Sequence, residues 1–337
     1  MRIEQFEPST DAGRLKACHD IVLAGAPIDH PNLPPWPLQS FRFKWTRGYD
    51  SVPSEAWLAV DDSAEPVGCY LLELPVKENV TLASVILQVP PARRRAGIGS
   101  DLLAHCVGRA RRAGRVRLGG EARDGSPGAA FARAAGAQPG IAEVNRILAV
   151  DSSLPARLGR LRAEARAKSV GYSLVSWLGV TPDEHLEGVA RLNNVMTDAP
   201  RDEGVQATSW DGPRVAEQEQ HALAHGMHLR TVAARHDSTG ELAGLTQICT
   251  DDGTPGWAFQ QITAVSKEHR GHRLGLLVKV ANLEQLISGD PGVRRILTGN
   301  AGANEHMIAI NEMLGFHVSD QYRSWDLDLA AGLGSAC

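Results

Sequence analysis

Residues 93–100 read Arg-Arg-Arg-Ala-Gly-Ile-Gly-Ser, and residues 269–275 read His-Arg-Gly-His-Arg-Leu-Gly. Each segment follows an apolar run that suits a strand and precedes apolar residues at helical spacing. Glycines between a strand and the start of a helix point several backbone N–H groups at one place, where the helix dipole and the arginines add positive potential. Each segment therefore predicts a loop that holds a pyrophosphate.

The two loops belong to an internal repeat. At a constant offset of 176 residues, two stretches of the chain align without a gap. The identical pairs are Asp61 and Asp237, Glu65 and Glu241, Gly68 and Gly244, Val89 and Val265, Arg94 and Arg270, and Gly99 and Gly275. An Ala-Pro-x-Asp turn is also predicted in each half, at residues 26–29 and 199–202. The sequence therefore predicts one domain used twice.

Both halves have the element order of an α+β domain. Helices come first, around residues 11–24 and 183–196. A strand pair with a polar hairpin, a long apolar strand, the Arg/Gly loop and a helix then follow in each half. This order predicts, in each half, a mixed and mostly antiparallel sheet flanked by helices.

The predicted boundary between the halves is a connector helix at residues 152–169. Three leucines at helical spacing mark its apolar side, namely Leu154, Leu158 and Leu161. The predicted domains are therefore residues 1–151 and 170–330, with a tail at 331–337.

Composition limits the classes of partner. The 337 residues are 43% hydrophobic and 22% charged with a net charge of −4, which favours globular domains over a general nucleic-acid or anionic-membrane binder. The first residues lack the apolar region of a signal peptide, and no apolar run is long enough for a membrane span. The five cysteines are odd in number and never spaced as Cys-x-x-Cys, which favours free thiols in the cytoplasm.

Two common phosphate-binding motifs do not fit the loops. A dinucleotide fingerprint needs a third glycine where this chain has Leu102, and a P-loop needs Gly-Lys-Ser/Thr. The loops instead resemble the signature of the GNAT superfamily of acyl-CoA-dependent N-acyltransferases, Arg/Gln-x-x-Gly-x-Gly/Ala after a valine that ends a strand. The first loop matches fully, whereas Arg273 replaces the middle glycine in the second. A non-glycine residue disfavours the positive φ, and so the full wrapping of a phosphate, at that position.

The segment from Asn300 to Phe316 adds a resemblance to tandem, two-domain actinobacterial GNAT proteins. The resemblance implies that an acyl-CoA, most simply acetyl-CoA, is the co-substrate, with its pyrophosphate on a loop and its pantetheine arm along the preceding strand. The residues assigned to it are Val89, Arg94, Arg95, Ala96, Gly97, Ile98, Gly99 and Ser100 in the first half, and Val265, Arg270, Gly271, His272, Arg273, Leu274, Gly275, Asn300 and Asn304 in the second.

The catalytic positions of the family are altered in this chain. Many GNAT enzymes place a tyrosine where this chain has Asn311, and an amide cannot protonate a thiolate leaving group. Gln260 lies on the strand where related proteins often carry a carboxylate. We therefore expect the base that deprotonates the amine among Asp198, Asp202 and Glu203, beside the acceptor groove.

These features predict an N-acyltransferase that acts on a small-molecule amine, with the second domain catalytic because it keeps Asn304. The fuller match of the first loop leaves the opposite assignment open. A non-catalytic CoA-binding scaffold, transfer to a carrier protein and decarboxylation of an acyl-CoA are the alternatives. No metal is expected, although His221, His225 and His228 have the spacing of a zinc site. We expect a monomer or a homodimer.

Overall fold

The computed structural model describes residues 1–47, 54–195, 202, 204–301 and 304–330. The chain divides into two compact units. Unit 1 comprises Met1–Glu143, Asp202–Gln206 and Asp320–Cys337, and unit 2 comprises Val144–Arg201 and Ala207–Ser319. Within the described residues, no helix has the length and apolar character that crossing a lipid bilayer requires.

Unit 1 is a sheet covered by helices on both faces. Its strands lie in the order β1-β2-β3-β4-β5-β12-β6. All the pairings from β1 to β4 are antiparallel, and β4 and β5 are parallel. Its elements are β1 (Arg2–Phe6), α1 (Ala12–Asp29), α2 (Leu38–Arg47), β2 (Glu55–Val60), β3 (Pro66–Glu73), β4 (Leu82–Gln88), α3 (Ile98–Arg112), β5 (Arg117–Arg123), α4 (Pro127–Ala134), the first half of β6 (Gln138–Ala149) and most of β12 (His317–Asp328).

Two hydrophobic clusters place the helices of unit 1. Leu102 and Cys106 of α3 are buried with Tyr70 and Leu72 of the sheet on one face. On the other face, α1 and α2 bury a second cluster that includes Trp45, fully enclosed at 1% exposure. Tyr70 and Leu72 of β3 thus face α3, whereas Cys69 and Leu71 face α1 and α2, as the alternation of side chains along a strand requires.

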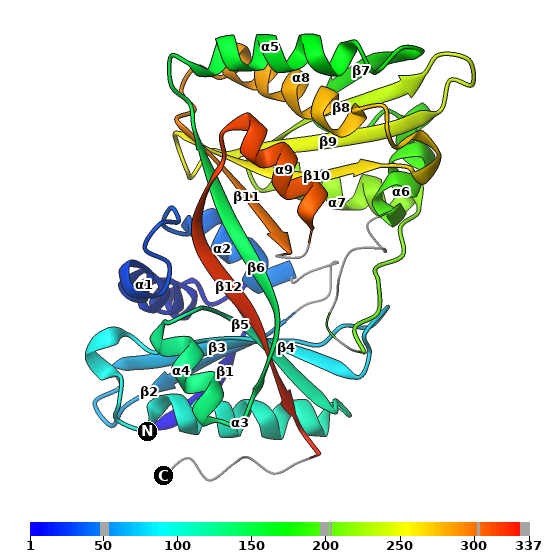
Figure 1. Ribbon diagram of the computed structural model, residues 1–337. Coiled ribbons are helices and arrows are strands. Elements are labelled where there is room, and N and C mark those ends of the chain that lie inside the picture. Colours follow the sequence, from blue (N-terminus) through cyan, green and yellow to red (C-terminus); the bar gives the residue numbers. More distant parts are fainter. Residues whose placement is uncertain (48–53, 196–201, 203, 302–303, 331–337) are drawn as a thin grey trace. The chain divides into compact units, whose positions relative to one another are not determined.

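Unit 2 repeats this architecture (Figure 1). Its strands lie in the order β6-β11-β10-β9-β8-β7, with β10 and β11 parallel. Its elements are the second half of β6, α5 (Leu154–Arg166), β7 (Tyr172–Leu178), α6 (Leu186–Val195), α7 (Gly212–Ala224), β8 (Met227–His236), β9 (Leu242–Asp251), β10 (Trp257–Val265), α8 (Leu274–Gly289), β11 (Arg295–Ala301) and α9 (Glu305–Leu314).

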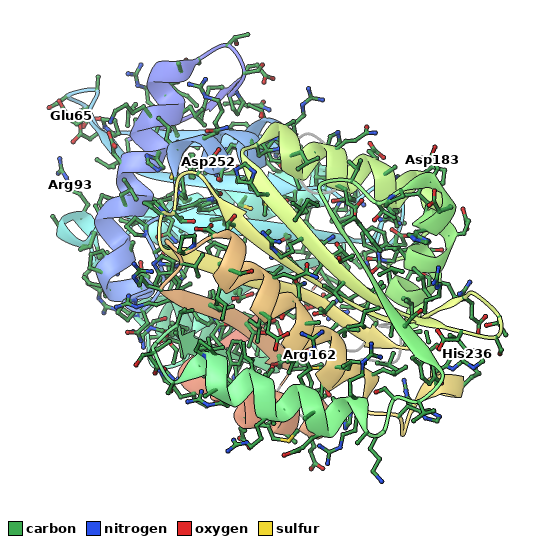
Figure 2. The ribbon with its side chains drawn as sticks, turned by 90° about the horizontal axis from the view of Figure 1, so that it is seen from above. Glu65, Arg93, Arg162, Asp183, His236 and Asp252 are labelled. Carbon is green, nitrogen blue, oxygen red and sulfur yellow. The ribbon has the colours of Figure 1, made fainter. Side chains whose placement is uncertain are left out.

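In unit 2, α5, α8 and α9 cover one face of the sheet, and α6 and α7 cover the other. The predicted connector helix is α5, and its three leucines are buried against α8. Arg162 points from α5 toward α8, where it forms an ion pair of 2.6 Å with Glu284 (Figure 2). The connector is therefore part of the core of unit 2.

The last strand of the chain completes the sheet of unit 1. Residues Tyr322 to Asp328 of β12 pair antiparallel with Arg123 to Arg117 of β5. Trp325 and Leu327 are buried in the cluster formed with α3. The compact units therefore differ from the contiguous domains predicted at 1–151 and 170–330, because this strand is counted with the start of the chain.

The predicted helices, hairpins and long apolar strands are present in both halves. Of the two predicted Ala-Pro-x-Asp turns, the one at residues 199–202 falls mostly outside the described residues, and the one at residues 26–29 is wrong. Ala26 to Asp29 are not a separate turn, because they form the last turn of α1 with Pro27 inside the helix. The helix continues because the missing N–H of proline removes only one hydrogen bond, and the N–H of His30 still binds the Ala26 carbonyl at 2.8 Å.

Candidate functional site

The two predicted pyrophosphate loops have the same backbone. In each unit a short 3₁₀ turn follows the long apolar strand, at Pro91–Arg93 and at Lys267–His269. The next residue has φ and ψ of −69° and 160° at Arg94, and of −70° and 159° at Arg270. The 176-residue offset therefore holds through the loops and to the first residues of α3 and α8.

Each loop has two residues with a positive φ, and these lie at equivalent positions. The arginine and the glycine are in opposite order in the two loops. Unit 1 has Arg95 at φ 64° and Gly97 at φ 82°, and unit 2 has Gly271 at φ 88° and Arg273 at φ 54°. The expectation that Arg273 disfavours a positive φ is therefore wrong. A left-handed conformation costs an L-residue only about 1–2 kcal/mol, which a folded domain sustains at one position. Both loops thus present the N–H groups of a helix start in one arrangement.

The arginine of the first loop has partners within unit 1. Nε of Arg94 donates to the Val89 carbonyl at 2.9 Å, and its two terminal nitrogens donate to the carboxylate of Asp29 at 3.1 and 2.5 Å. Arg94 thus ties the loop to the end of α1. The exposed residues Ala96 and Gly97 leave the backbone of the loop open to solvent.

A cleft follows the loop in unit 1, where β4 and β5 separate. The two strands pair over three residues from Leu82 to Ser84, and beyond them a pocket of about 640 Å³, its mouth included, opens between the strands, α3 and α4. Its walls include Leu87, Leu103 and Phe131. Parallel strands that separate next to a pyrophosphate loop suit a long, partly apolar arm such as pantetheine.

In unit 2, β10 carries a β-bulge just before the loop. Ile248 of β9 pairs with Gln260, whereas Thr246 pairs with Thr263, so Gln247 lies opposite two residues of β10. A bulge leaves backbone groups out of the ladder and is common next to active sites. The bulge lies three to four residues before Val265, on the strand that leads into the pyrophosphate loop.

Polar side chains take up the backbone groups around the bulge. Nε2 of Gln260 donates to the Gln247 carbonyl at 2.7 Å and to Oγ1 of Thr246 at 3.0 Å. Nδ2 of Asn282, on α8, donates to the Thr246 carbonyl at 3.3 Å. Gln260 and Asn282 are almost fully buried, so these bonds replace contacts with water that the buried carbonyls have lost.

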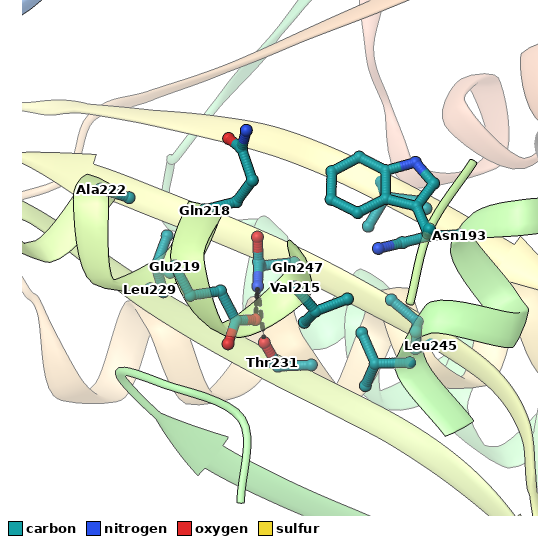
Figure 3. A pocket seen from close by; sticks show the side chains of 12 residues that line it. Asn193, Val215, Gln218, Glu219, Ala222, Leu229, Thr231, Leu245 and Gln247 are labelled. Carbon is teal, nitrogen blue, oxygen red and sulfur yellow. Dashed lines mark hydrogen bonds between the residues drawn. The ribbon is translucent and has the colours of Figure 1, made fainter. Parts of the chain in front are cut away.

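A pocket lies on the α6 and α7 face of the sheet in unit 2, beside the bulge. Its volume is about 440 Å³, mouth included, and Ile262 of the bulge is part of its wall. Figure 3 shows the carboxylate of Glu219, the amide of Gln247 and the hydroxyl of Thr231 close together in it. Seven of its twelve lining side chains are apolar or aromatic, namely Val189, Trp210, Val215, Ala222, Leu229, Leu245 and Ile262.

Glu219 is the ionisable residue of this pocket wall and is 6% exposed. Its carboxylate accepts from the N–H of Thr181 at 2.6 Å, from the hydroxyl of Thr181 at 2.9 Å and from Nε2 of Gln247 at 3.1 Å. Burial raises the pKa of Glu219, and these hydrogen bonds lower it in part.

The chain is similar in structure to a tandem GNAT protein and to several proteins named as acetyltransferases. A tandem GNAT protein from the clavulanic acid biosynthesis pathway, solved without AcCoA, is 29% identical, with a TM-score of 0.81 over 98% of this chain and 99% of that one. The chain has the fold of a tandem GNAT protein. A GCN5-related N-acetyltransferase from Sphaerobacter thermophilus is 17% identical, with a TM-score of 0.66 over 99% and 98% of the two chains.

A putative acetyltransferase from Pyrococcus horikoshii is more distant, at 14% identity and a TM-score of 0.55 over 98% and 90% of the two chains. No family model and no curated protein matches the sequence. The likeness to GNAT acetyltransferases supports an acyltransferase that uses an acyl-CoA.

The three asparagines predicted for the GNAT site form hydrogen bonds within unit 2. Asn304 caps α9, where its Oδ1 accepts from the N–H of Met307 at 3.2 Å. Asn311 is fully buried, and its Nδ2 donates to Oδ1 of Asn300 at 2.7 Å. Asn311 therefore links α9 to the end of β11, and its buried amide is not placed to protonate a thiolate.

Of the predicted bases, only Asp202 belongs to the described residues, and it is not at the pocket. Asp202 accepts from the N–H of Ile141 at 2.7 Å, both residues are counted in unit 1, and Asp202 is absent from the pocket wall. Asp198 and Glu203 lie outside the described residues. Gln260, predicted at the catalytic strand, is at the bulge but is occupied by backbone carbonyls.

Glu219 is not among the predicted site residues, although its position in the sequence carries a signal. Residues 212–224 form an amphipathic helix, and Glu219 falls on the apolar side, four residues after Val215. A carboxylate on the buried side of a helix rarely occurs without a partner or a function.

The three histidines do not form a common site. His221 is on α7, His225 ends that helix and His228 is on β8. Among the residues described, no three histidine, cysteine or acidic side chains are placed to hold a metal ion.

Proposed function

We propose that this chain is an acyl-CoA-dependent N-acyltransferase that transfers an acyl group, most simply acetyl from acetyl-CoA, to the amine of a small molecule. The observation that carries the proposal is the bulge in β10, the strand that leads into the second pyrophosphate loop. An acyl-CoA whose pyrophosphate lies on the loop, and whose arm runs back along β10, presents its thioester near the bulge.

The reaction in this proposal is direct attack of the amine on the thioester in a ternary complex. The loop and the strand hold the thioester, and the pocket beside Ile262 holds the amine. Backbone N–H groups released by the bulge are suited to stabilise the negative charge that develops on the thioester oxygen, and one such donor is typically worth a factor of about 10²–10³. CoA thiolate takes the remaining amine proton when it leaves.

Unit 2 is the catalytic unit in this proposal. Unit 1 has the same loop, but its strands β3 and β4 pair without a shift in register. In unit 1, the face of the sheet covered by α1 and α2 corresponds to the face of unit 2 that carries the pocket. Phe41 and Trp45 fill this face over the buried Leu71, and their stacked ring centroids are 4.7 Å apart. Unit 1 is thus built to bind a CoA-like ligand without an amine beside it.

A matched pair of loop variants tests the proposal. Ala96 and His272 are exposed and equivalent in the two loops, so Ala96→Glu and His272→Glu place one carboxylate at each pyrophosphate position without burying it. We expect His272→Glu to lower kcat/KM for acetyl-CoA by at least about tenfold, because like charges repel. We expect a smaller loss for Ala96→Glu. Thiol release from acetyl-CoA with a panel of primary amines measures both.

Each outcome decides between the alternatives. If coenzyme A raises the Tm but no amine releases thiol, the chain is a CoA-binding scaffold. If Ala96→Glu abolishes turnover and His272→Glu does not, unit 1 is the catalytic unit. Release of CO₂ from malonyl-CoA with formation of acetyl-CoA, in the absence of an amine and without free thiol, would instead identify an acyl-CoA decarboxylase.

A further inference from the structure

The carboxylate of Glu219 is buried without a cation. It is 6% exposed, and among the described residues its partners are only Thr181 and Gln247, both neutral. A carboxylate accepts about four hydrogen bonds, and this one accepts three, with a single bond at Oε2. Burying an uncompensated charge is costly, so a partner that brings a positive charge into the pocket is favoured.

The hydrogen bonds of Glu219 connect it to the bulge. Gln247, whose Nε2 binds Glu219, is the residue opposite the bulge on the neighbouring strand. The side chain of Gln247 therefore connects Glu219 to the strand position that faces the bulge. Figure 3 shows Glu219 and Gln247 directed toward each other within the pocket.

We propose that Glu219 binds the acceptor as an ammonium and takes its proton, and that the acceptor is a primary amine on an alkyl or arylalkyl chain. This inference rests on the proposed function, because it assigns the amine-binding group of the same site. The apolar side chains of the pocket, among them Leu229, Leu245 and Ile262, suit a hydrocarbon chain and offer few partners to the hydroxyls of a sugar.

Glu219 accepts one proton from the ammonium, R-NH₃⁺, which leaves a neutral amine with a free electron pair. That pair forms the C–N bond to the thioester carbon as the C–S bond breaks. The amine loses its second proton to the CoA thiolate, and Glu219 releases the first to solvent after the amide leaves. A raised pKa brings the carboxyl closer to the task of a base at neutral pH.

A binding experiment tests the charge recognition without requiring turnover. The full chain with coenzyme A is heated in n-butylammonium chloride, in potassium chloride of equal concentration and in n-butanol. We expect n-butylammonium alone to raise the Tm, by about 2–4 °C at tenfold excess over Kd. Glu219→Gln should abolish this shift. A shift of equal size in Glu219→Gln, or no shift in the natural chain, would overturn the proposal.

Two further variants separate recognition from structure. Glu187→Gln makes the same chemical change at an exposed carboxylate of unit 2 that binds the N–H of Gly212 and is outside the pocket, and it should keep the full shift. Thr181→Val removes one hydrogen bond to Glu219 but leaves the carboxylate. It should lower the Tm without ligand and retain the n-butylammonium shift. If Thr181→Val loses the shift as fully as Glu219→Gln, the role of Glu219 is structural.

The pH dependence gives a second signature. The other charged or titratable groups on the elements around the pocket are Arg214, Glu217 and His221 on α7, Asp183, Glu184 and His185 in the turn before α6, Glu187 and Arg191 on α6, His228, Arg230, Arg235 and His236 on β8, and Asp251 on β9. None of them lines the pocket or contributes to the raised pKa of Glu219. We expect kcat/KM for n-butylamine to fall as the pH falls through this pKa, because the base becomes protonated. In Glu219→Gln this acid limb should disappear, together with at least about tenfold of kcat/KM.

The two proposals fail in different ways. If no amine releases thiol from acetyl-CoA, but n-butylammonium binding depends on Glu219, the acyltransferase proposal falls and the ammonium site stands. If thiol release proceeds at the same rate and with the same pH profile in Glu219→Gln, the acyltransferase stands and the role of Glu219 falls.

Discussion

The central strand pairs of the two units differ by one residue. In unit 1, β3 and β4 pair in continuous register, with Tyr70 opposite Leu87 and Leu72 opposite Val85. In unit 2, the equivalent β9 and β10 lose register between Gln260 and Thr263. The one extra residue changes a closed ladder into a strand with backbone groups available for a ligand.

The cores around these strands differ accordingly. Where unit 2 has Thr246, Thr263 and Asn282 around the bulge, the 176-residue offset gives Tyr70, Leu87 and Cys106 in unit 1. Buried carbonyls that leave a ladder need new donors, so a bulge within a core requires polar side chains close to it. The two units thus differ in the core around this strand pair and not in the backbone of their pyrophosphate loops, which is alike.

Removing the amide that occupies the bulge should have the largest effect. Gln260→Leu leaves the Gln247 carbonyl without its donor, at a cost of about 1–3 kcal/mol in the free energy of unfolding. If the bulge closes or shifts, the thioester loses its donors, and we expect kcat to fall by at least about tenfold. Urea unfolding and thiol-release kinetics measure the two effects.

Ser84, which lies 176 residues before Gln260 in the sequence, provides the control. It lies in a regular ladder opposite Glu73, so Ser84→Leu should change kcat by less than about twofold. Equal losses of kcat in the two variants would mean that the bulge is not what distinguishes the units.

A buried lysine is a second difference between the units. Lys279 of α8 is 1% exposed, and its Nζ lies 5.5 Å from the ring of Phe316. Its equivalent on α3 is Leu103. Burial lowers the pKa of Lys279 from 10.5 to about 7. We expect Lys279→Met to raise the free energy of unfolding at pH 7 by about 1–2 kcal/mol, because it keeps the chain length and removes a buried polar group.

The sign of the pH dependence checks this assignment. Between pH 7 and 10.5 the unfolded chain binds a proton at Lys279 that the folded chain does not, so the stability of the natural chain rises with pH across this range. The advantage of Lys279→Met should therefore shrink as the pH approaches 10. Leu103→Met, the control in unit 1, should show no such trend, and a pH-independent advantage for Lys279→Met would place the lysine in a charged state throughout.

Local signals allowed the elements and the loops to be predicted from sequence. Leu154, Leu158 and Leu161 have helical spacing in the sequence and form a buried helix face in the structure. Arg94 and Arg270 are related by the 176-residue offset and have nearly the same φ and ψ angles. Such features depend on residues a few positions apart. The expectation for Arg273 is wrong because the preference against a positive φ is only about 1–2 kcal/mol, and the rest of the loop overrides it.

The features that were missed depend on distant residues. The pairing of β12 with β5 joins Asp328 to Arg117, and apolar periodicity does not say which strand a strand will pair with. Glu219 acquires its environment from Thr181, 38 residues away, and from Gln247. The predicted bases belong to a loop segment, whereas Glu219 is on the buried side of a helix.

The smallest expected effects concern the exchanged residues of the loops. Arg273→Gly and Arg95→Gly each remove a left-handed arginine and should raise the free energy of unfolding by up to about 1 kcal/mol, part of which the greater freedom of glycine in the unfolded chain offsets. Gly271→Ala and Gly97→Ala place a Cβ at the same φ range and should lower it by about 1 kcal/mol, for reasons of backbone alone, since nothing lies within 4 Å of either Cβ. Urea unfolding of the four variants measures the pattern. A loss of stability in Arg273→Gly would mean that its ion pair with Glu164, at 3.5 Å and half exposed, outweighs the backbone term, against the usual small worth of such pairs.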